Sequence, residues 1–280
     1  MFYLILAILC SSMVQIVMRL STNKVTNNMS MLAMNYVVCS LIAACYTGFG
    51  NLFPLRAEGL DTALGVGFGQ GLLYLLAFIW LQMNNRRNGI VLSASFMKLG
   101  LLVPMAVSIF LFGEEPGALH IIGFILALLS IILINYEPSG TSAAGFKLGL
   151  VTLLLIGGLG DTMAKLYQEW GTPALASQFL FYTFASALVM SICLLIYKKE
   201  KPGRTELLFG TLISFPNYFS SLFLLQALEE LDAVIVYPCY NVATIFIATL
   251  AGLWLFKERL QKRQWIAICI IVVALVLLNM

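Results

Sequence analysis

Charged residues and histidine are scarce in this chain. Only 10% of its 280 residues are charged, and it contains a single histidine, His120. Because a soluble domain carries about a quarter charged residues, this scarcity excludes an ordinary soluble fold. One histidine cannot build a metal cluster, and the six cysteines lie inside apolar runs without a C-x-x-C pair, so we expect no metal, disulfide framework or cofactor. The net charge of +3 is spread over short connections, which argues against a nucleic-acid partner.

Apolar runs long enough to cross a bilayer are abundant instead. Hydrophobic residues make up 61% of the chain, and a helix needs about 20 mostly apolar residues to span the hydrocarbon core. The first run has no basic stretch before Phe2 and no small-residue cleavage site after it, so we expect a spanning helix rather than a signal peptide. The sequence predicts an all-α integral membrane protein with ten transmembrane helices, at about 2–20, 29–48, 61–82, 89–112, 118–135, 145–167, 174–197, 205–227, 233–256 and 263–279.

The two halves of the chain repeat each other. Laid over one another at a constant offset of 144, residues 59–135 and 203–279 share many identical positions: Gly59/Gly203, Leu64/Leu208, Tyr74/Tyr218, Leu81/Leu225, Gln82/Gln226, Leu111/Leu255, Phe112/Phe256, Glu114/Glu258, Ile122/Ile266, Leu133/Leu277 and Asn135/Asn279. We therefore predict a first five-helix repeat at 1–135, a linker at 136–144 and a second five-helix repeat at 145–280.

The repeats are predicted to be inverted. Five helices is an odd number, so the second copy enters the membrane the opposite way up and a pseudo-twofold axis lies in the membrane plane. The first helices of the repeats correspond less closely: Gln15 and Arg19 lie opposite Asp161 and Lys165. Two inverted repeats of membrane helices are typical of a transporter.

Basic residues gather on one side of the predicted membrane. Thirteen of the 16 lysines and arginines share one face: Arg19, Lys24, Arg86, Arg87, Lys147, Lys198, Lys199, Lys201, Arg204, Lys257, Arg259, Lys262 and Arg263. The other face has Arg56 and Lys165, and Lys98 lies within a span. Because cytoplasmic loops carry the excess of Lys and Arg, this bias predicts odd-numbered loops in the cytoplasm and both termini outside.

A glutamate ends the fourth helix of each repeat, in Leu111-Phe112-Gly113-Glu114 and in Leu255-Phe256-Lys257-Glu258. With the ten helices and the inverted repeats, this pattern resembles the EamA-like branch of the drug/metabolite transporter superfamily along essentially the whole chain. The resemblance implies secondary transport of small metabolites, often export. Members are usually drawn with both ends cytoplasmic, and the charge bias here predicts the reverse. We expect both glutamates to bond to a helix start or a basic residue, in a structural or gating role.

Two charges lie well inside predicted spans, Lys98 in the fourth and Asp161 in the sixth. An ionisable side chain at mid-membrane costs at least about 2.5–3.5 kcal/mol, so each needs a reason to be there. If both line one central cavity, Lys98 binds an anionic group and Asp161 a cationic group or a proton. Alternatively, they pair with each other, or Asp161 pairs with Lys165, only to offset burial.

Aromatic and polar side chains recur at depth in the predicted spans. Such a set suits cations, through cation–π contact, or flat organic molecules, through stacking, although ordinary packing explains any one aromatic equally well. The candidate substrate-binding residues besides Lys98 and Asp161 are Tyr74, Tyr218, Phe96, Tyr237, Tyr240, Asn241, Gln70, Asn217, Gln15 and Tyr36. Pro104, Pro216 and Pro238 fall within spans, where each removes a backbone donor and can bend its helix.

Three alternatives belong to other classes. Asp161 lies in a literal Gly-x-Gly-Asp, which resembles the motif of intramembrane aspartyl proteases, but Asp61 and Asp232 lie at helix starts and provide no second aspartate at mid-span. A channel needs a ring of like residues, which a twofold repeat does not supply. An exporter of cationic drugs or quaternary amines would use the aromatic pocket.

The sequence favours a secondary transporter rather than an enzyme. The opposite signs of Lys98 and Asp161 favour a zwitterion such as an amino acid, moved by alternating access through a central cavity between the repeats. The first helix has no carboxylate, so Asp161 is the mid-membrane candidate for proton coupling, while exchange or facilitated diffusion needs no titrating group. We expect a multi-pass protein of the cell membrane, with a small-molecule substrate and the lipid bilayer as its partners, acting as a monomer or homodimer.

Overall fold

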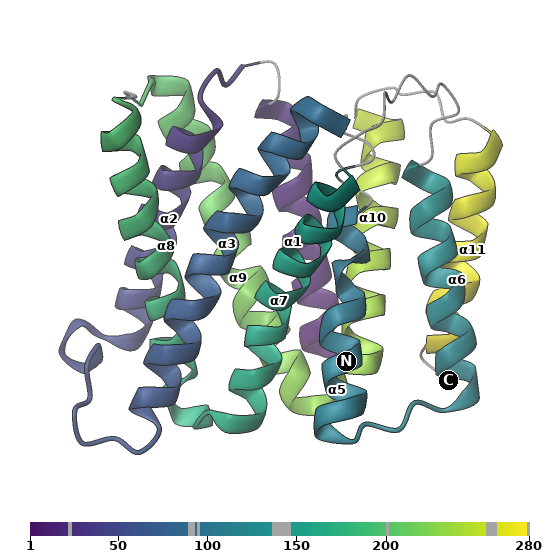
Figure 1. Cartoon of the computed structure of the whole chain (residues 1–280), viewed down its shortest axis with the longest axis horizontal. Helices are drawn as coiled ribbons and strands as arrows, with labels where there is room; N and C mark the ends of the chain where they lie inside the picture. Colours follow the sequence, from purple (N-terminus) through teal and green to yellow (C-terminus); the bar gives the residue numbers. More distant parts are fainter. Residues whose placement is uncertain are drawn as a thin grey trace. The chain divides into compact units, whose positions relative to one another are not determined.

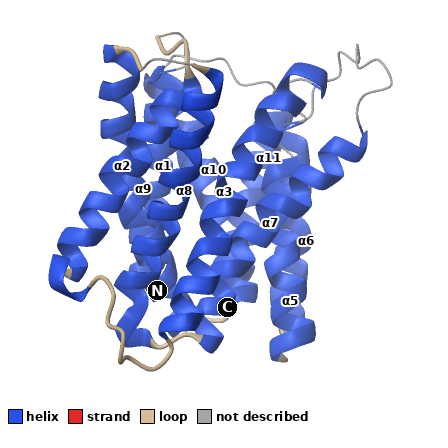
Figure 2. Cartoon of the chain, turned by 60° about the vertical axis from the view of Figure 1, so that its left-hand side comes forward, coloured by secondary structure: helices blue, strands red, loops and turns tan. Residues whose placement is uncertain are grey.

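The computed structural model describes residues 1–21, 24–88, 93, 96–135, 147–199, 202–255 and 262–278. Helices make up nearly all of these residues, and no strand occurs among them (Figure 2). The predicted all-α fold class is therefore confirmed. The predicted linker at 136–144 and Glu258 lie outside the described residues, and the assignment of the chain to two repeats stays a prediction.

The described helices follow the predicted spans closely. In the first half they are α1 (Phe2–Ser21), α2 (Asn28–Thr47), α3 (Leu60–Asn88), the short 3-10 turn η2 (Leu99–Leu101), α5 (Leu102–Phe112) and α6 (Ala118–Asn135). In the second half they are α7 (Lys147–Trp170), α8 (Ala176–Lys198), α9 (Arg204–Glu230), α10 (Ala233–Leu255) and α11 (Lys262–Leu278). Three helices run well past their predicted ends: α3 by more than one and a half turns, and α7 and α9 each by nearly one turn.

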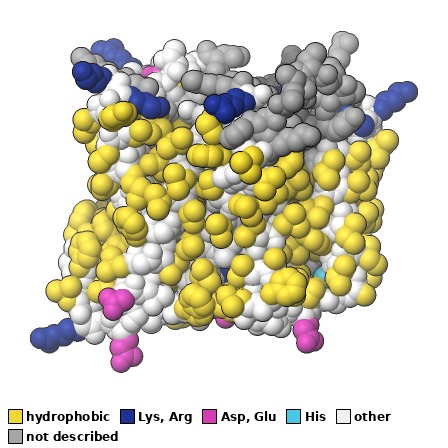
Figure 3. Space-filling model, viewed as in Figure 1, with side chains coloured by type: hydrophobic (Ala, Val, Ile, Leu, Met, Phe, Trp, Pro, Cys, Tyr) yellow, Lys and Arg dark blue, Asp and Glu magenta, His cyan; other side chains and the backbone are white. Residues whose placement is uncertain are grey.

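These helices have the length and composition of membrane-spanning helices. Seven helices of the described residues are long and apolar enough to cross one, and the stretches Phe96–Phe112 and Ala118–Leu133 are shorter apolar helices. Large apolar side chains are exposed on their sides, Phe110 by 88% and Trp254 by 79%. On the face shown in Figure 3, hydrophobic side chains cover the sides of the helices, and most of the charged ones lie near helix ends. Exposed apolar sides with polar ends suit a lipid environment.

The chain forms two compact units. Unit 1 comprises Met1–Leu75 and Met163–Glu229, and unit 2 comprises Leu76–Thr162 and Glu230–Met280. Each unit packs together helices that are equivalent in the two predicted repeats: α2 with α8 in unit 1, and α6 with α11 and α5 with α10 in unit 2 (Figure 1). Packing of equivalent helices is what a twofold-related pair of repeats produces.

Close helix packing in unit 1 depends on small residues. A Cβ added at Gly71 of α3 would collide with Ser186 Oγ and the Thr183 carbonyl of α8, so only glycine permits this approach. The core beside it contains the fully buried rings of Phe179 and Phe184. Because lipid tails are as apolar as the side chains, such close contact holds membrane helices together.

Polar contacts tie the loops of unit 1 together at each end. At one end, Glu206 of α9 accepts hydrogen bonds from the backbone N–H and the hydroxyl of Thr26, both at 3.0 Å, just before α2. At the other end, the Thr172 hydroxyl donates to the Glu58 carbonyl at 3.1 Å. The loops between α1 and α2 and between α8 and α9 therefore share one end, and the loops before α3 and α8 share the opposite end.

The fourth span changes its helical form at its centre. Lys98 directly precedes η2, and α5 follows, with Pro104 near its start. Pro104 has no N–H to offer the Gly100 carbonyl, which explains why the regular α-helical ladder is not maintained here. The span ends at Gly113, whose left-handed backbone conformation (φ 70°) closes α5.

Candidate functional site

The twelve residues predicted to bind substrate divide equally between the units. Unit 1 contains Gln15, Tyr36, Gln70, Tyr74, Asn217 and Tyr218, and unit 2 contains Phe96, Lys98, Asp161, Tyr237, Tyr240 and Asn241. Within each unit the structure shows which of these side chains meet.

Lys98 and Asp161 come together in unit 2. Their charges lie close enough to attract each other, and both side chains are half-buried. Lys98 precedes η2 in the fourth span, and Asp161 lies inside α7 after the glycine-rich turn Gly157-Gly158-Leu159-Gly160. The pair can therefore offset its own burial or present both charges to a ligand.

Glycine lets the helices of the charged pair approach each other. A Cβ added at Gly158 of α7 would collide with the Gly100 carbonyl oxygen of η2 and would lie 2.7 Å from Val103 Cβ. At the neighbouring Gly157 an added Cβ would be 3.8 Å from Met97, which is ordinary contact. Gly158 therefore sets how closely the Asp161 helix packs against the Lys98 helix.

One side chain of α10 contacts the main chain at Asp161. The Tyr237 hydroxyl donates to the backbone carbonyl of Asp161 at 2.7 Å, and the Tyr237 ring is fully buried. The Asn241 amide donates to the Tyr237 carbonyl at 3.1 Å. Tyr240 and Phe96 are half-buried. Tyr237 thus contacts the main chain at Asp161 and leaves the carboxylate to other partners.

Gln70 and Tyr74 form a polar contact in unit 1. The Gln70 amide donates to the Tyr74 hydroxyl at 3.2 Å, and the Thr183 hydroxyl of α8 donates to Gln70 Oε1 at 3.1 Å. Gln70 is buried, whereas Tyr74 is half-buried. This contact satisfies a buried amide and holds one aromatic side chain at a partly open position.

A second polar cluster joins α2 to α9 in unit 1. The Asn217 amide donates to Asn35 Oδ1 at 3.4 Å and to Cys39 Sγ at 3.8 Å, and the Cys39 thiol donates to the Ser214 carbonyl at 3.3 Å. Asn217, placed in the site by the sequence, therefore lies in an interhelical network that also contains Asn35 and Cys39.

The remaining predicted residues of unit 1 differ in burial. Tyr218 is fully buried, with its ring 6.5 Å from that of Tyr46 and 6.0 Å from that of Phe184. Tyr36 is also buried, with its ring 6.5 Å from that of Phe184. Gln15 of α1 is half-buried. Tyr36 and Tyr218 belong to the aromatic core of unit 1, so direct contact with a substrate would require that core to open.

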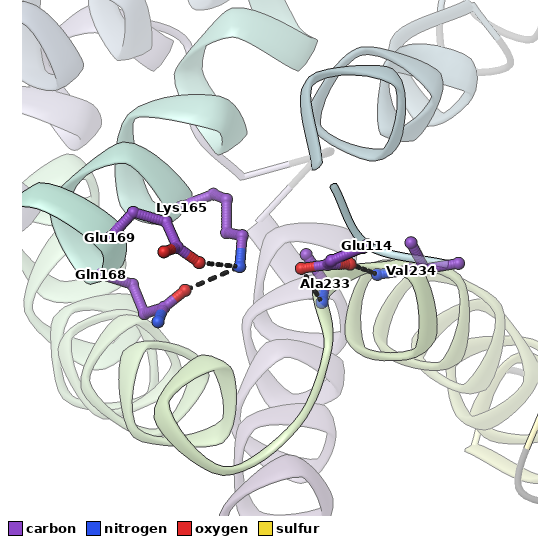
Figure 4. Close-up of polar contacts among 6 residues, drawn as sticks. All are labelled: Glu114, Lys165, Gln168, Glu169, Ala233 and Val234. Atoms are coloured by element: carbon purple, nitrogen blue, oxygen red, sulfur yellow. Dashed lines mark hydrogen bonds and ion pairs between the residues drawn. The ribbon is translucent and has the colours of Figure 1, made fainter. Parts of the chain in front are cut away.

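Lys165 is a buried charge, although its position in the sequence predicts that it lies at a face of the membrane. Only 3% of its side chain is exposed, and its ammonium donates to Glu169 Oε1 at 2.6 Å and to Gln168 Oε1 at 2.7 Å (Figure 4). The helix was predicted to end at 167, whereas α7 continues to Trp170. The four-residue spacing of Lys165 and Glu169, typical of a helical ion pair, was the available signal.

Glu114 caps the start of α10. Its two carboxylate oxygens accept the backbone N–H groups of Ala233 at 3.1 Å and Val234 at 2.9 Å (Figure 4). The predicted bond to a helix start is present, and the helix concerned, α10, is the one that the sequence predicts to be equivalent to the fourth span. A carboxylate at a helix N-terminus is favoured by the helix dipole.

The structure gives no support to a second aspartate beside Asp161. Asp61 is exposed in the first turn of α3, and Asp232 is exposed just before α10. Among the described residues, no group of three or more His, Cys, Asp or Glu side chains is arranged to hold a metal ion.

The long apolar helices of the described residues are those of a multi-pass membrane protein. Residues 144–280 match the EamA-like transporter family. This match places the chain in the drug/metabolite transporter superfamily, whose EamA-like members are transporters of small molecules rather than enzymes.

Two further similarities cover nearly the whole chain. An uncharacterized protein of Haemophilus influenzae is 27% identical over 275 residues, which is 95% of this chain and 93% of that protein. A protein of known crystal structure is 15% identical and has a TM-score of 0.76 over 99% of this chain and 94% of its own. At that identity the second similarity concerns the fold alone.

Proposed function

We propose that this transporter moves a small zwitterionic metabolite, such as an amino acid, across the cell membrane. The observation that carries the proposal is that Lys98 and Asp161, both half-buried inside the spans of unit 2, lie near enough for their opposite charges to attract each other. A zwitterion has a carboxylate for Lys98 and an ammonium for Asp161. When a zwitterion binds, its carboxylate would attract Lys98 and its ammonium would attract Asp161. Each buried charge would therefore keep an opposite charge beside it.

Alternating access is the mechanism that we propose. Inverted repeats give a transporter two related conformations, and substrate sites lie near the bilayer midplane where a helix is interrupted. The interruption at η2, directly after Lys98, supports this mechanism because it separates the residue that would bind the substrate from the rest of the span. We further propose that both termini lie outside the cell.

Export of cationic drugs or quaternary amines is the second candidate. The half-buried rings of Tyr240 and Phe96 in unit 2 favour it, because aromatic faces attract cations. Lys98 has no part in that recognition and would repel a cation.

The experiment is a thermal-shift screen of the purified protein with amino acids, quaternary amines and organic anions. We expect amino acids to raise the melting temperature of the parent protein and to lose this effect in Lys98→Met. Lys198→Met is the matched control, since Lys198 is exposed at the end of α8 and the chemical change is the same. Stabilisation by quaternary amines alone, unchanged in Lys98→Met, would instead support the cation exporter.

Asp161 is the residue that we propose for proton coupling. In proteoliposomes with an imposed pH gradient, Asp161→Asn would abolish gradient-driven uptake of the amino acid identified in the screen and preserve exchange of that substrate. Full gradient dependence in the variant would remove Asp161 as the proton carrier.

A further inference from the structure

The start of α10 is fixed at two points one helical turn apart. Glu114 accepts the N–H groups of Ala233 and Val234, as Figure 4 shows, and Tyr237 donates to the Asp161 carbonyl. Ala233 and Tyr237 have no exposed surface, and Val234 is 2% exposed. The side chains at both points are therefore enclosed by protein.

The hydrogen bonds between Glu114 and the start of α10 are expected to be strong. The first N–H groups of a helix have no partner within it, and the burial of Ala233 and Val234 keeps water from replacing that partner. A carboxylate that accepts two of them makes charge-assisted hydrogen bonds at the positive end of the helix dipole. The backbone of Glu114 is fixed as well, because its N–H donates to the Ser108 carbonyl of α5 at 3.1 Å.

The two points connect the helices that carry the charged pair. Glu114 directly follows the fourth span, which has Lys98 on the far side of η2. Tyr237 reaches the main chain of α7 at Asp161. The first turn of α10 thus joins the end of the Lys98 span to the Asp161 backbone, and all of these residues belong to unit 2.

We propose that Glu114 is a positioning residue for the substrate site. By capping α10, it sets the place at which Tyr237 holds Asp161, and so couples the end of the fourth span to the separation of Asp161 and Lys98. The functional part of this inference rests on the proposed function, whereas the structural coupling does not depend on any substrate.

The test is hydrogen–deuterium exchange of the full chain in lipid nanodiscs without substrate. Peptides that cover 233–237 in α10 and 158–166 in α7 are compared in the parent protein, Glu114→Gln, Tyr237→Phe and the double variant. Glu115→Gln is the matched control, because Glu115 is the adjacent glutamate and its side chain is exposed.

We expect Glu114→Gln to speed exchange several-fold in both peptides, because Gln supplies one acceptor where the carboxylate supplies two. Tyr237→Phe should speed exchange in α7, and adding Glu114→Gln to it should then change α10 without further change in α7. Faster exchange confined to α10 in Glu114→Gln, or equal effects of Glu115→Gln, would overturn the proposal.

A binding measurement separates this inference from the proposed function. An equimolar mixture of the standard amino acids is the probe, and we expect the thermal shift that it causes to shrink in Glu114→Gln and to persist in Glu115→Gln. If the mixture causes no shift in the parent protein, the proposed substrate is wrong, and the exchange data still decide whether Glu114 positions Asp161.

Discussion

At the scale of single residues, the main unfavourable free energy in this molecule comes from burying charged side chains away from water. Lys165 offsets that cost with Glu169 one turn along α7, where the lysine is 3% exposed and the glutamate 31% exposed. The two partners are therefore unequal. If Lys165 is removed, the partly exposed Glu169 carboxylate still has access to the solvent outside the protein. If Glu169 is removed, the Lys165 ammonium stays buried without its countercharge.

This inequality predicts an order of stabilities. Glu169→Ala removes the countercharge of a buried ammonium and should destabilise the protein by about 2 kcal/mol or more. Lys165→Met replaces the buried charge with an apolar chain of similar length and should cost clearly less. The double variant Lys165→Met with Glu169→Ala should melt above Glu169→Ala alone. Melting temperatures in detergent give the order, and a Lys165→Met protein that melts below Glu169→Ala would contradict this account.

Other residue contacts show the limits of prediction from sequence. Lys98 and Asp161 stand out because a charge in an apolar run is visible in the sequence, and in the structure the two lie near enough for their charges to attract. The partners of Glu114 and Tyr237 are backbone groups, Val234 N–H and the Asp161 carbonyl. Every residue type except proline carries both groups, so no sequence pattern identifies them.

At the scale of elements, hydrophobic length is the property that the sequence predicts best. The predicted span at 29–48 is observed as α2, Asn28–Thr47, because the apolar run and the Asn27 cap coincide. Both α3 and α7 continue past their predicted ends, because polar residues there find partners within the helix: Asn84 donates to the Trp80 carbonyl in α3, and Gln168 and Glu169 accept from Lys165 in α7. Gly100 and Pro104 are the sequence signal for the break at η2, although a proline alone does not specify where a 3-10 turn forms.

The contact between η2 and α7 yields a prediction with a built-in control. In Gly158→Ala the new methyl group collides with the Gly100 carbonyl and crowds Val103, so we expect a loss of about 1–3 kcal/mol from overpacking. In Gly157→Ala the methyl group meets only ordinary contacts to Met97, and the change should be neutral or stabilising by up to about 1 kcal/mol, because alanine favours a helix.

The control excludes a general intolerance of this turn to substitution. Both variants change one glycine to alanine at adjacent positions of α7, so they differ only in what the new methyl group meets. Thermal melting in detergent measures the stability, and the Lys98-dependent ligand shift measures the site. Equal melting temperatures for the two variants would mean that η2 and α7 do not pack as closely as described.

At the scale of the whole molecule, charge at the loop ends predicts orientation. Within unit 1, the Thr26–Glu206 contact brings together the loops that follow α1 and α8, and the residues there include Lys24 and Lys199. The Thr172–Glu58 contact brings together the loops at the other end, where Arg56 is the basic residue. This grouping agrees with the alternation of loops that the predicted spans require.

Labelling of single cysteines tests which end faces the cytoplasm. In a background without native cysteines, Asn51→Cys and Lys199→Cys each place a thiol at an exposed loop position of unit 1, at opposite ends. The excess of lysine and arginine predicts that a membrane-impermeant maleimide labels Asn51→Cys on intact cells and labels Lys199→Cys only after permeabilisation. The reverse pattern would place both termini in the cytoplasm, as members of the family are usually drawn. Loop charge would then be a weaker determinant here than the fold itself, and the Lys98–Asp161 proposal would be unaffected, because it depends on depth in the membrane and not on direction.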